Sequence, residues 1–235
     1  SIKTNLEIDI KTDKCSRYMG RIVKNVIVGP SPEWVVKHLA SIGQRSINNI
    51  VDATNIVMFD CGHPVHAYDL QKLSSEKILV KELESDMDFP VVGKDEIVAK
   101  LKTGDIVVSD MDKCIALAGI KGGTNSGISV HESYTTDIVL EVANFNAVAV
   151  RKTGKRLSLN SDARKRFENN VPIELGSYAM IELSALIMEM CPNAIFEDIV
   201  DVYPVKQEER KVSFTTDISK KMVILSYMCL IGGQI

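Results

Sequence analysis

Apolar side chains recur at helical spacing in three stretches of the chain, each of which predicts a helix. The predicted helices cover residues 32–42, 46–61 and 172–191. Ser31 and Ser46 stand where a hydroxyl commonly caps a helix start, and Gly62 and Pro64 stand where a helix commonly ends. Trp34 falls within the first helix, and we expect its ring to pack in the core.

Short apolar runs bounded by turn residues predict strands elsewhere in the chain. These runs lie at 17–29, 78–80, 97–101, 106–108, 115–118, 136–143 and 195–203. Residues 86–95 read as an exposed turn region instead. Together the pattern predicts a mixed α+β fold, with a sheet-rich, layered core of mostly antiparallel strands flanked by helices.

One predicted strand, 136–143, carries a charged residue in an otherwise apolar pattern. The alternation of side chains along a strand places Val139, Glu141 and Ala143 on one face. A carboxylate in such a position usually points to solvent from a half-buried sheet. If Glu141 is buried, it needs a hydrogen-bond partner or a raised pKa. The sequence leaves both interpretations open.

The composition is that of an ordinary globular protein, with 45% hydrophobic and 25% charged residues. No apolar run approaches the roughly 18 residues of a membrane span, and charged residues interrupt the N-terminal stretch, so we expect no membrane association. The five cysteines are odd in number and form no C-x-x-C pair. We therefore expect reduced thiols in a cytoplasmic protein, rather than a disulfide framework or a metal site.

The net charge of −3 does not predict a nucleic-acid partner, but the distribution of charge is uneven. Residues 151–166 hold seven basic residues against one acidic residue, a local charge of +6. A basic tract of this kind can bind phosphates by Coulomb attraction, or it can simply form a solvated surface.

Polar residues interrupt the apolar pattern of the second predicted helix. Asp52, Thr54 and Asn55 lie within it, and His66 follows in what we expect to be a rigid turn. This arrangement indicates either the wall of a pocket or a core helix with a satisfied histidine nearby.

Glycine is concentrated in residues 119–127. Glycine allows backbone N–H groups to approach a ligand closely, although a hairpin connection would have the same composition. The spacing of lysine and hydroxyl residues excludes a P-loop.

Two blocks of sequence resemble the beta chain of bacterial phenylalanyl-tRNA synthetase, in its paired third and fourth domains, which edit mischarged tRNA. The first block comprises Arg45-Ser46, VDATNIV at 51–57 and GHPVHAYD at 62–69. The second comprises LEVANF at 140–145, SDAR at 161–164 and RFENNVP at 166–172, together with ALAG at 116–119 and Gly122-Gly123. The resemblance covers roughly residues 17–205.

The chain departs from the family pattern at three places. Ser161 replaces a threonine, Arg164 replaces a small residue, and Asn169-Asn170 replaces an Arg-Gly pair. Ser161 keeps the hydroxyl group of the family residue. The other two departures bear on the strength of tRNA contact and not on the fold.

The resemblance implies a role for each residue of the site. Oriented water would cut the ester, helped by hydrogen bonds from His66, Thr54, Asn55 and Ser161. Glu141 would bind the hydroxyl of tyrosine, while Gly122, Gly123 and Ala163 would line a pocket with room for the ring. Arg45 would contact the terminal nucleotide of the tRNA.

The resemblance also implies the setting of this activity. The partners would be the acceptor end of tRNA(Phe) and, in the parent heterotetramer, the synthetase alpha subunit. We expect no metal and no cofactor in this part of the enzyme, since ATP and magnesium serve only the parent's synthesis of Phe-tRNA.

Two alternatives compete with an editing module. One is a non-catalytic scaffold for tRNA docking and subunit packing; the other is a free-standing editing factor, which the cut appearance of both chain ends disfavours. We expect an editing domain at 1–205, followed at 206–235 by a linker and the start of a truncated domain.

Overall fold

The computed structural model describes residues 2–93, 97–128 and 135–208, together with Lys211, Ser213, Thr215 and Asp217. Contacts divide the chain into one unit at Ser1–Pro204 and another at Val205–Ile235, and the account below concerns the first unit. The apolar run at 222–231, where we expect the truncated domain to begin, lies outside the described residues.

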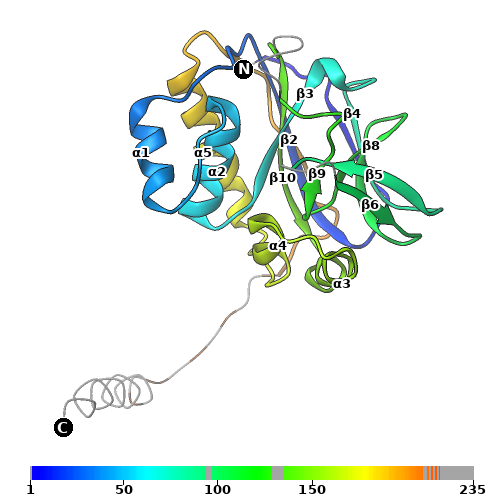
Figure 1. Ribbon diagram of the computed structural model, residues 1–235. Coiled ribbons are helices and arrows are strands. Elements are labelled where there is room, and N and C mark those ends of the chain that lie inside the picture. Colours follow the sequence, from blue (N-terminus) through cyan, green and yellow to red (C-terminus); the bar gives the residue numbers. More distant parts are fainter. Residues whose placement is uncertain are drawn as a thin grey trace. The chain divides into compact units, whose positions relative to one another are not determined.

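The central sheet joins strands from distant parts of the chain (Figure 1). Its strand order is β11 (Ile195–Phe196), β2 (Cys15–Lys24), β10 (Ile138–Phe145) and β3 (Val65–Asp69), with β12 (Val200–Val202) also paired to β2. All of these pairs are antiparallel. Every residue of β10 is buried, because this strand lies between two others and both faces of the sheet are covered.

A second sheet packs against one face of the central sheet. Its strand order is β1 (Glu7–Ile10), β4 (Lys77–Glu82), β7 (Ile106–Ser109), β8 (Cys114–Leu117) and β9 (Lys121–Gly122), and β1 with β4 is its parallel pair. A separate hairpin consists of β5 (Met87–Val91) and β6 (Ile97–Leu101). The prediction of an exposed turn at 86–95 was therefore wrong: Phe89 and Val91 are buried strand residues.

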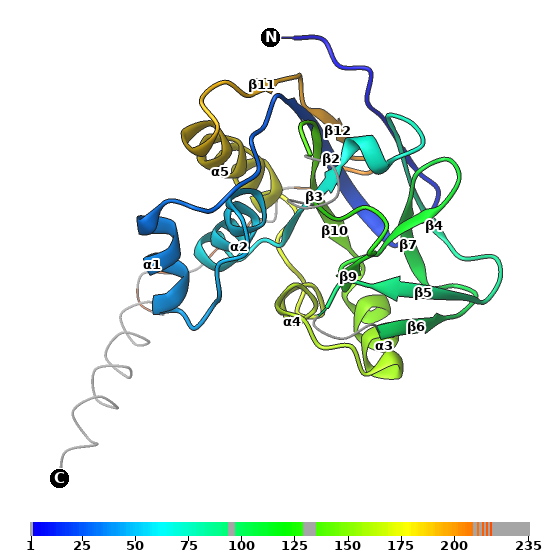
Figure 2. The same cartoon turned by 45° about the horizontal axis from the view of Figure 1, so that its top comes forward.

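Helices cover the opposite face of the central sheet and one of its ends (Figures 1 and 2). The covering group is α1 (Glu33–Ser41), α2 (Asn49–Cys61) and α5 (Leu175–Met190). The group at the end is α3 (Ala147–Leu157) and α4 (Asp162–Phe167), and a short 3₁₀ helix, Leu70–Lys72, follows β3. The predicted fold class, α+β with layered and mostly antiparallel sheets flanked by helices, is confirmed.

The alternation along β10 separates two apolar cores. Leu140 and Val142 point into the core beneath α2 and α5, whereas Val139 and Ala143 point into the core between the two sheets. Glu141 shares the second orientation, as the spacing of side chains predicts.

The helix starts differ from those predicted. Asn48, and not Ser46, caps α2 by accepting a hydrogen bond from the backbone N–H of Val51. Ser46 and Ser31 instead donate their hydroxyl hydrogens to Asp52, each over 2.5 Å. Several residues near each start have capping side chains, and the local pattern does not distinguish between them.

The N-terminus of α5 and the position of Trp34 are further corrections. The helix predicted from residue 172 begins at Leu175, preceded by Glu174 as its cap residue. Trp34 is 43% exposed and does not lie in the core, because Val35 and Leu39, four residues apart, form the buried side of α1.

Candidate functional site

Glu141 lies in the middle of β10, between the two sheets. Its neighbours across the strands are Gly20 on β2 and His66 on β3. The side chain of Glu141 is 8% exposed, so the solvent-facing interpretation was wrong and the buried one is confirmed. A buried carboxylate requires hydrogen-bond donors.

Two tyrosines supply those donors. Tyr18 on β2 and Tyr68 on β3 donate hydroxyl hydrogens to Oε2 of Glu141 over 2.6 and 2.5 Å. Burial raises the pKa of Glu141, while these two hydrogen bonds act in the opposite direction. Burial and the nearby carboxylate raise the pKa of each tyrosine well above its usual value, so both hydroxyls remain donors.

The sequence analysis missed both tyrosines. Tyr68 lies inside the first motif block, two residues after His66, so the two side chains share a face of β3. Tyr18 carries a weaker signal, since only the pairing of β2 with β10 brings it to Glu141.

His66 lies on strand β3 and not in a turn, which corrects its predicted setting. Its ring meets that of Tyr68 edge-to-face, with the centroids 4.6 Å apart. Burial lowers the pKa of His66 to about 4, although part of the side chain still reaches solvent. The imidazole is therefore neutral at pH 7 and can accept a proton.

Gly122 on β9 packs directly against His66. A Cβ atom at this position would lie 2.9 Å from Nε2 of His66, closer than side chains normally approach. Glycine at 122 thus allows the second sheet to approach the imidazole, and the structure brings Glu141, His66 and Gly122 together.

Gly123 and Ser161 are linked to the same corner of the molecule through its backbone. The place of a Cβ at Gly123 is occupied by Oδ1 of Asn125 and Cζ of Phe89, each 2.6 Å away. Ser161 caps α4 and donates its hydroxyl hydrogen to the carbonyl oxygen of Ile120 over 2.7 Å. Ser161 therefore fastens α4 to the chain segment that leads into β9.

Ala163 is the third residue of this region, on α4. It is half-buried and packs against the core between the sheets.

Thr54 and Asn55 lie on α2, which covers the other face of the central sheet. Thr54 donates its hydroxyl hydrogen to the carbonyl oxygen of Val51 over 2.7 Å, and Asn55 is half-buried. His66 points away from that face. These two residues can reach the imidazole only around β3, the last strand of the described sheet.

Arg45 is exposed and precedes α2, whereas His66 follows its other end. A helix of 13 residues is roughly 20 Å long. The structure therefore places these two residues at opposite ends of the helix, as their spacing in the sequence predicts.

Several residues of the basic tract have partners within the protein. Arg156 pairs with Asp105, and Arg164 pairs with Glu168 over 3.0 Å while its guanidinium lies against Gly154. The guanidinium of Arg166 lies 4.6 Å from the ring centroid of Phe59. The charge available for phosphates is thus smaller than the count of +6.

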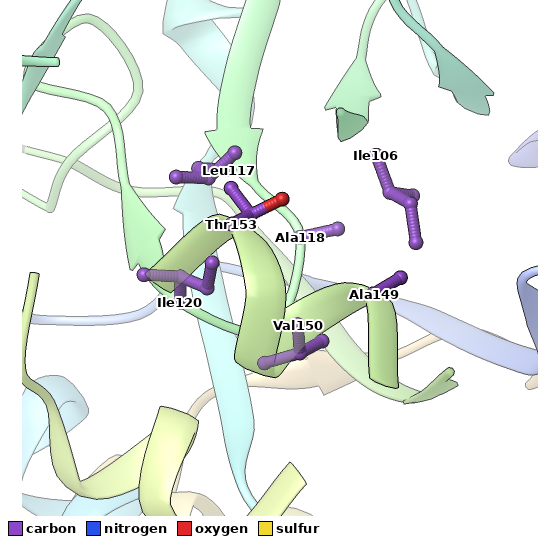
Figure 3. A pocket seen from close by; sticks show the side chains of 7 residues that line it. All are labelled: Ile106, Leu117, Ala118, Ile120, Ala149, Val150 and Thr153. Carbon is purple, nitrogen blue, oxygen red and sulfur yellow. The ribbon is translucent and has the colours of Figure 1, made fainter. Parts of the chain in front are cut away.

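The two surface hollows that we describe lie away from Glu141 and His66. The first is a seam beside α3, too narrow for a water molecule, with Thr153 as its one hydroxyl-bearing residue (Figure 3). The second, about 490 Å³, lies beside β1 and β4 and is lined mainly by charged residues. In the described ranges, no cluster of residues fits a metal ion and no helix could cross a bilayer.

Comparison with known proteins identifies the family. A family model described as the B3/4 domain matches residues 14–192. The chain belongs to the B3/4 domain family. This membership confirms the resemblance predicted from the two motif blocks.

Relatives of this B3/4 domain are beta subunits of phenylalanine–tRNA ligase. The subunit of Syntrophotalea carbinolica is 41% identical over 199 residues, which cover 85% of this chain and 24% of that protein. The subunit of Protochlamydia amoebophila is 41% identical over 202 residues, covering 85% and 24%. That of Thermotoga maritima is 39% identical over 211 residues, covering 90% and 26%. The chain spans about a quarter of the length of these relatives.

Proposed function

We propose that this B3/4 domain is the editing module of a phenylalanine–tRNA ligase beta subunit, and that it hydrolyses tyrosine mischarged onto tRNA(Phe). The observation that carries the proposal is the pairing of Glu141 with His66 across β10 and β3. A buried carboxylate and a neutral imidazole face the same space between the sheets, as recognition of a hydroxyl and hydrolysis of an ester require.

The chemistry of the two amino acids explains why such a module is needed. Tyrosine differs from phenylalanine by one hydroxyl, and a hydrophobic synthetic pocket cannot strongly exclude an added hydroxyl. An editing pocket discriminates better, because phenylalanine would leave a buried acceptor unpaired at a cost of about 1–3 kcal/mol. We assign this acceptor to Glu141.

Hydrolysis needs an oriented water molecule and a donor for the oxyanion that forms. We assign the water to His66, which is neutral and able to accept its proton. Thr54 has committed its hydrogen to Val51 and offers only a lone pair. Asn55 is then the donor suited to the oxyanion, while Ser161 positions α4 against the segment that leads into β9.

The remaining roles extend to the parent enzyme. We propose that Arg45 contacts the terminal nucleotide, and that Gly122, Gly123 and Ala163 surround the amino acid ring. The partners are the acceptor end of tRNA(Phe) and the alpha subunit of a cytoplasmic synthetase, which ligates phenylalanine with ATP and magnesium at another site. We assign no cofactor to this domain.

One observation favours a second candidate, a scaffold without editing activity. Arg164, a departure from the family pattern, is used inside the protein against Gly154 and Glu168. A module that kept the fold for tRNA docking and subunit packing would tolerate such a change.

Deacylation by the assembled synthetase distinguishes the two candidates. We expect Tyr-tRNA(Phe) to be hydrolysed at least tenfold faster than Phe-tRNA(Phe), and the His66→Ala variant to lose most of this rate. His38→Ala is the matched control, because His38 is an exposed histidine that pairs with Asp60. Equal hydrolysis of both esters, or full activity of His66→Ala, would contradict the editing proposal; full activity would favour the scaffold.

A further inference from the structure

Two buried hydroxyls converge on a single oxygen atom of Glu141. Tyr18 approaches from β2 and Tyr68 from β3, so both strands that flank β10 contribute one. Each tyrosine is fully buried. Their rings pack in the core between the sheets, which limits how far either hydroxyl can move away from the carboxylate.

The two carboxylate oxygens differ as a consequence. Oε2 accepts both hydrogen bonds, whereas no residue in the described ranges donates to Oε1. No described lysine or arginine forms an ion pair with Glu141 either. The tyrosines therefore fix the rotation of the carboxylate and leave one oxygen with both of its lone pairs.

We propose that Tyr18 and Tyr68 are positioning residues for amino acid selection: they hold Oε2 of Glu141 so that Oε1 accepts the hydroxyl of tyrosine. This inference rests on the proposed editing function. Neither tyrosine needs to touch the substrate. Each acts through Glu141 by fixing its orientation and by stabilising its charged form.

The charged form matters for discrimination. A carboxylate left without a donor loses more on desolvation than a neutral carboxyl group does, so the penalty against phenylalanine is largest when Glu141 is ionised. Burial raises the pKa of Glu141, and the two tyrosine hydroxyls offset part of that rise. Without them, more of the carboxyl group would be protonated at neutral pH.

Few other titratable groups face Glu141. His66 pairs with it across β3 and is neutral at pH 7. The thiol of Cys15 on β2 lies near enough for the carboxylate to raise its pKa, and burial raises it further. Both groups stay neutral between pH 5 and 8, so a pH effect in this range reports on Glu141.

The direct test is a pH titration of the Glu141 carboxyl carbon by NMR in this 235-residue chain. We expect Tyr18→Phe and Tyr68→Phe each to raise the pKa of Glu141 by about one unit, because each removes a hydrogen bond to a charged group. Tyr178→Phe is the matched control, since Tyr178 is exposed on α5. An unchanged Glu141 pKa in both core variants would overturn the inference.

A second readout connects this coupling to selection. In the assembled synthetase, we expect each core variant to lower the Tyr-to-Phe ratio of deacylation rates at pH 7 about tenfold, and to restore part of it as the pH rises. A shifted pKa with an unchanged ratio would overturn the selective role. If the unmodified enzyme showed no preference between the esters, the editing proposal would fail, while the NMR titration would still decide the coupling.

Stability is measured alongside, because each substitution removes a buried hydroxyl. A drop in melting temperature with no change in either titration would show a structural role only, and would also count against the inference.

Discussion

A carboxylate between two sheets is in an unfavourable place, and the residues around Glu141 reduce that cost. Two hydroxyls satisfy one of its oxygens, and a neutral imidazole lies on the adjacent strand. The same low-dielectric surroundings that raise the pKa of Glu141 lower that of His66. One environment thus supplies both an acceptor for a hydroxyl and a base for water.

The lowered pKa of His66 gives a pH prediction. A histidine with a pKa of about 4 is neutral throughout the range from pH 7.5 to 5.5, so its contribution to hydrolysis should stay constant there and fall only as the pH approaches 4. The measurement is the deacylation rate against pH in a Glu141→Gln background, where the carboxyl group no longer titrates. A loss of rate with a midpoint near 6.5 would show an ordinary histidine and contradict the assignment.

The contact between Gly122 and His66 gives a second prediction. In Gly122→Ala the added Cβ would lie 2.9 Å from Nε2 of His66, so the ring must move. We expect a loss of at least tenfold in Tyr-tRNA(Phe) hydrolysis and a stability cost of about 1–3 kcal/mol. Gly29→Ala is the control, because nothing lies within 4 Å of a Cβ there. Unchanged hydrolysis by Gly122→Ala would exclude close packing as the reason for this glycine.

At the scale of elements, Asp52 organises the start of α2. It is fully buried and accepts hydrogen bonds from the hydroxyls of Ser31 and Ser46 and from the backbone N–H of Ile47. These bonds tie the segment that carries Arg45 to the helix. The polar residues of this helix therefore do not share one purpose, since Asp52 serves its fold.

Removing this carboxylate should be costly. We expect Asp52→Ala to lower the free energy of unfolding by about 3 kcal/mol, because three donors lose their partner. Asp60→Ala on the same helix is the control, since Asp60 is exposed and should change stability by less than about 0.5 kcal/mol. The measurement is denaturant unfolding of both variants, and equal values for the two would contradict the role of Asp52.

Elements with a clear period were predictable from sequence, and their termini were not. The run at 97–101 matches β6, and the helix predicted at 46–61 matches α2 except for its first turn. The turn expected at 86–95 failed because a short apolar run with few residues carries little periodic signal. Trp34 failed because a short helix with apolar residues around it does not reveal which side is buried.

At the scale of the whole molecule, the site depends on contacts between distant segments. Glu141 and His66 are 75 positions apart, and Tyr18 is 123 positions from Glu141. The alternation along β10 predicts the face on which Glu141 lies, but the cover over that face comes from the second sheet. The motif blocks supplied His66, whereas strand pairing alone brings Tyr18 to the carboxylate.

The distribution of charge also changes once the fold is known. Arg156, Arg164 and Arg166 contact groups within the protein, so the net charge of a tract overstates the charge that faces solvent. Lys152 and Lys155 are exposed residues of α3 that remain suited to a phosphate backbone.

The most direct test of the account is the ratio of Tyr-tRNA(Phe) to Phe-tRNA(Phe) hydrolysis at pH 7 by the assembled synthetase, with and without Glu141→Gln. Glutamine keeps the size of the side chain and removes its charge, so we predict that the ratio falls at least tenfold while Phe-tRNA(Phe) hydrolysis changes little. A ratio that stayed the same in the variant would show that Glu141 does not read the hydroxyl of tyrosine.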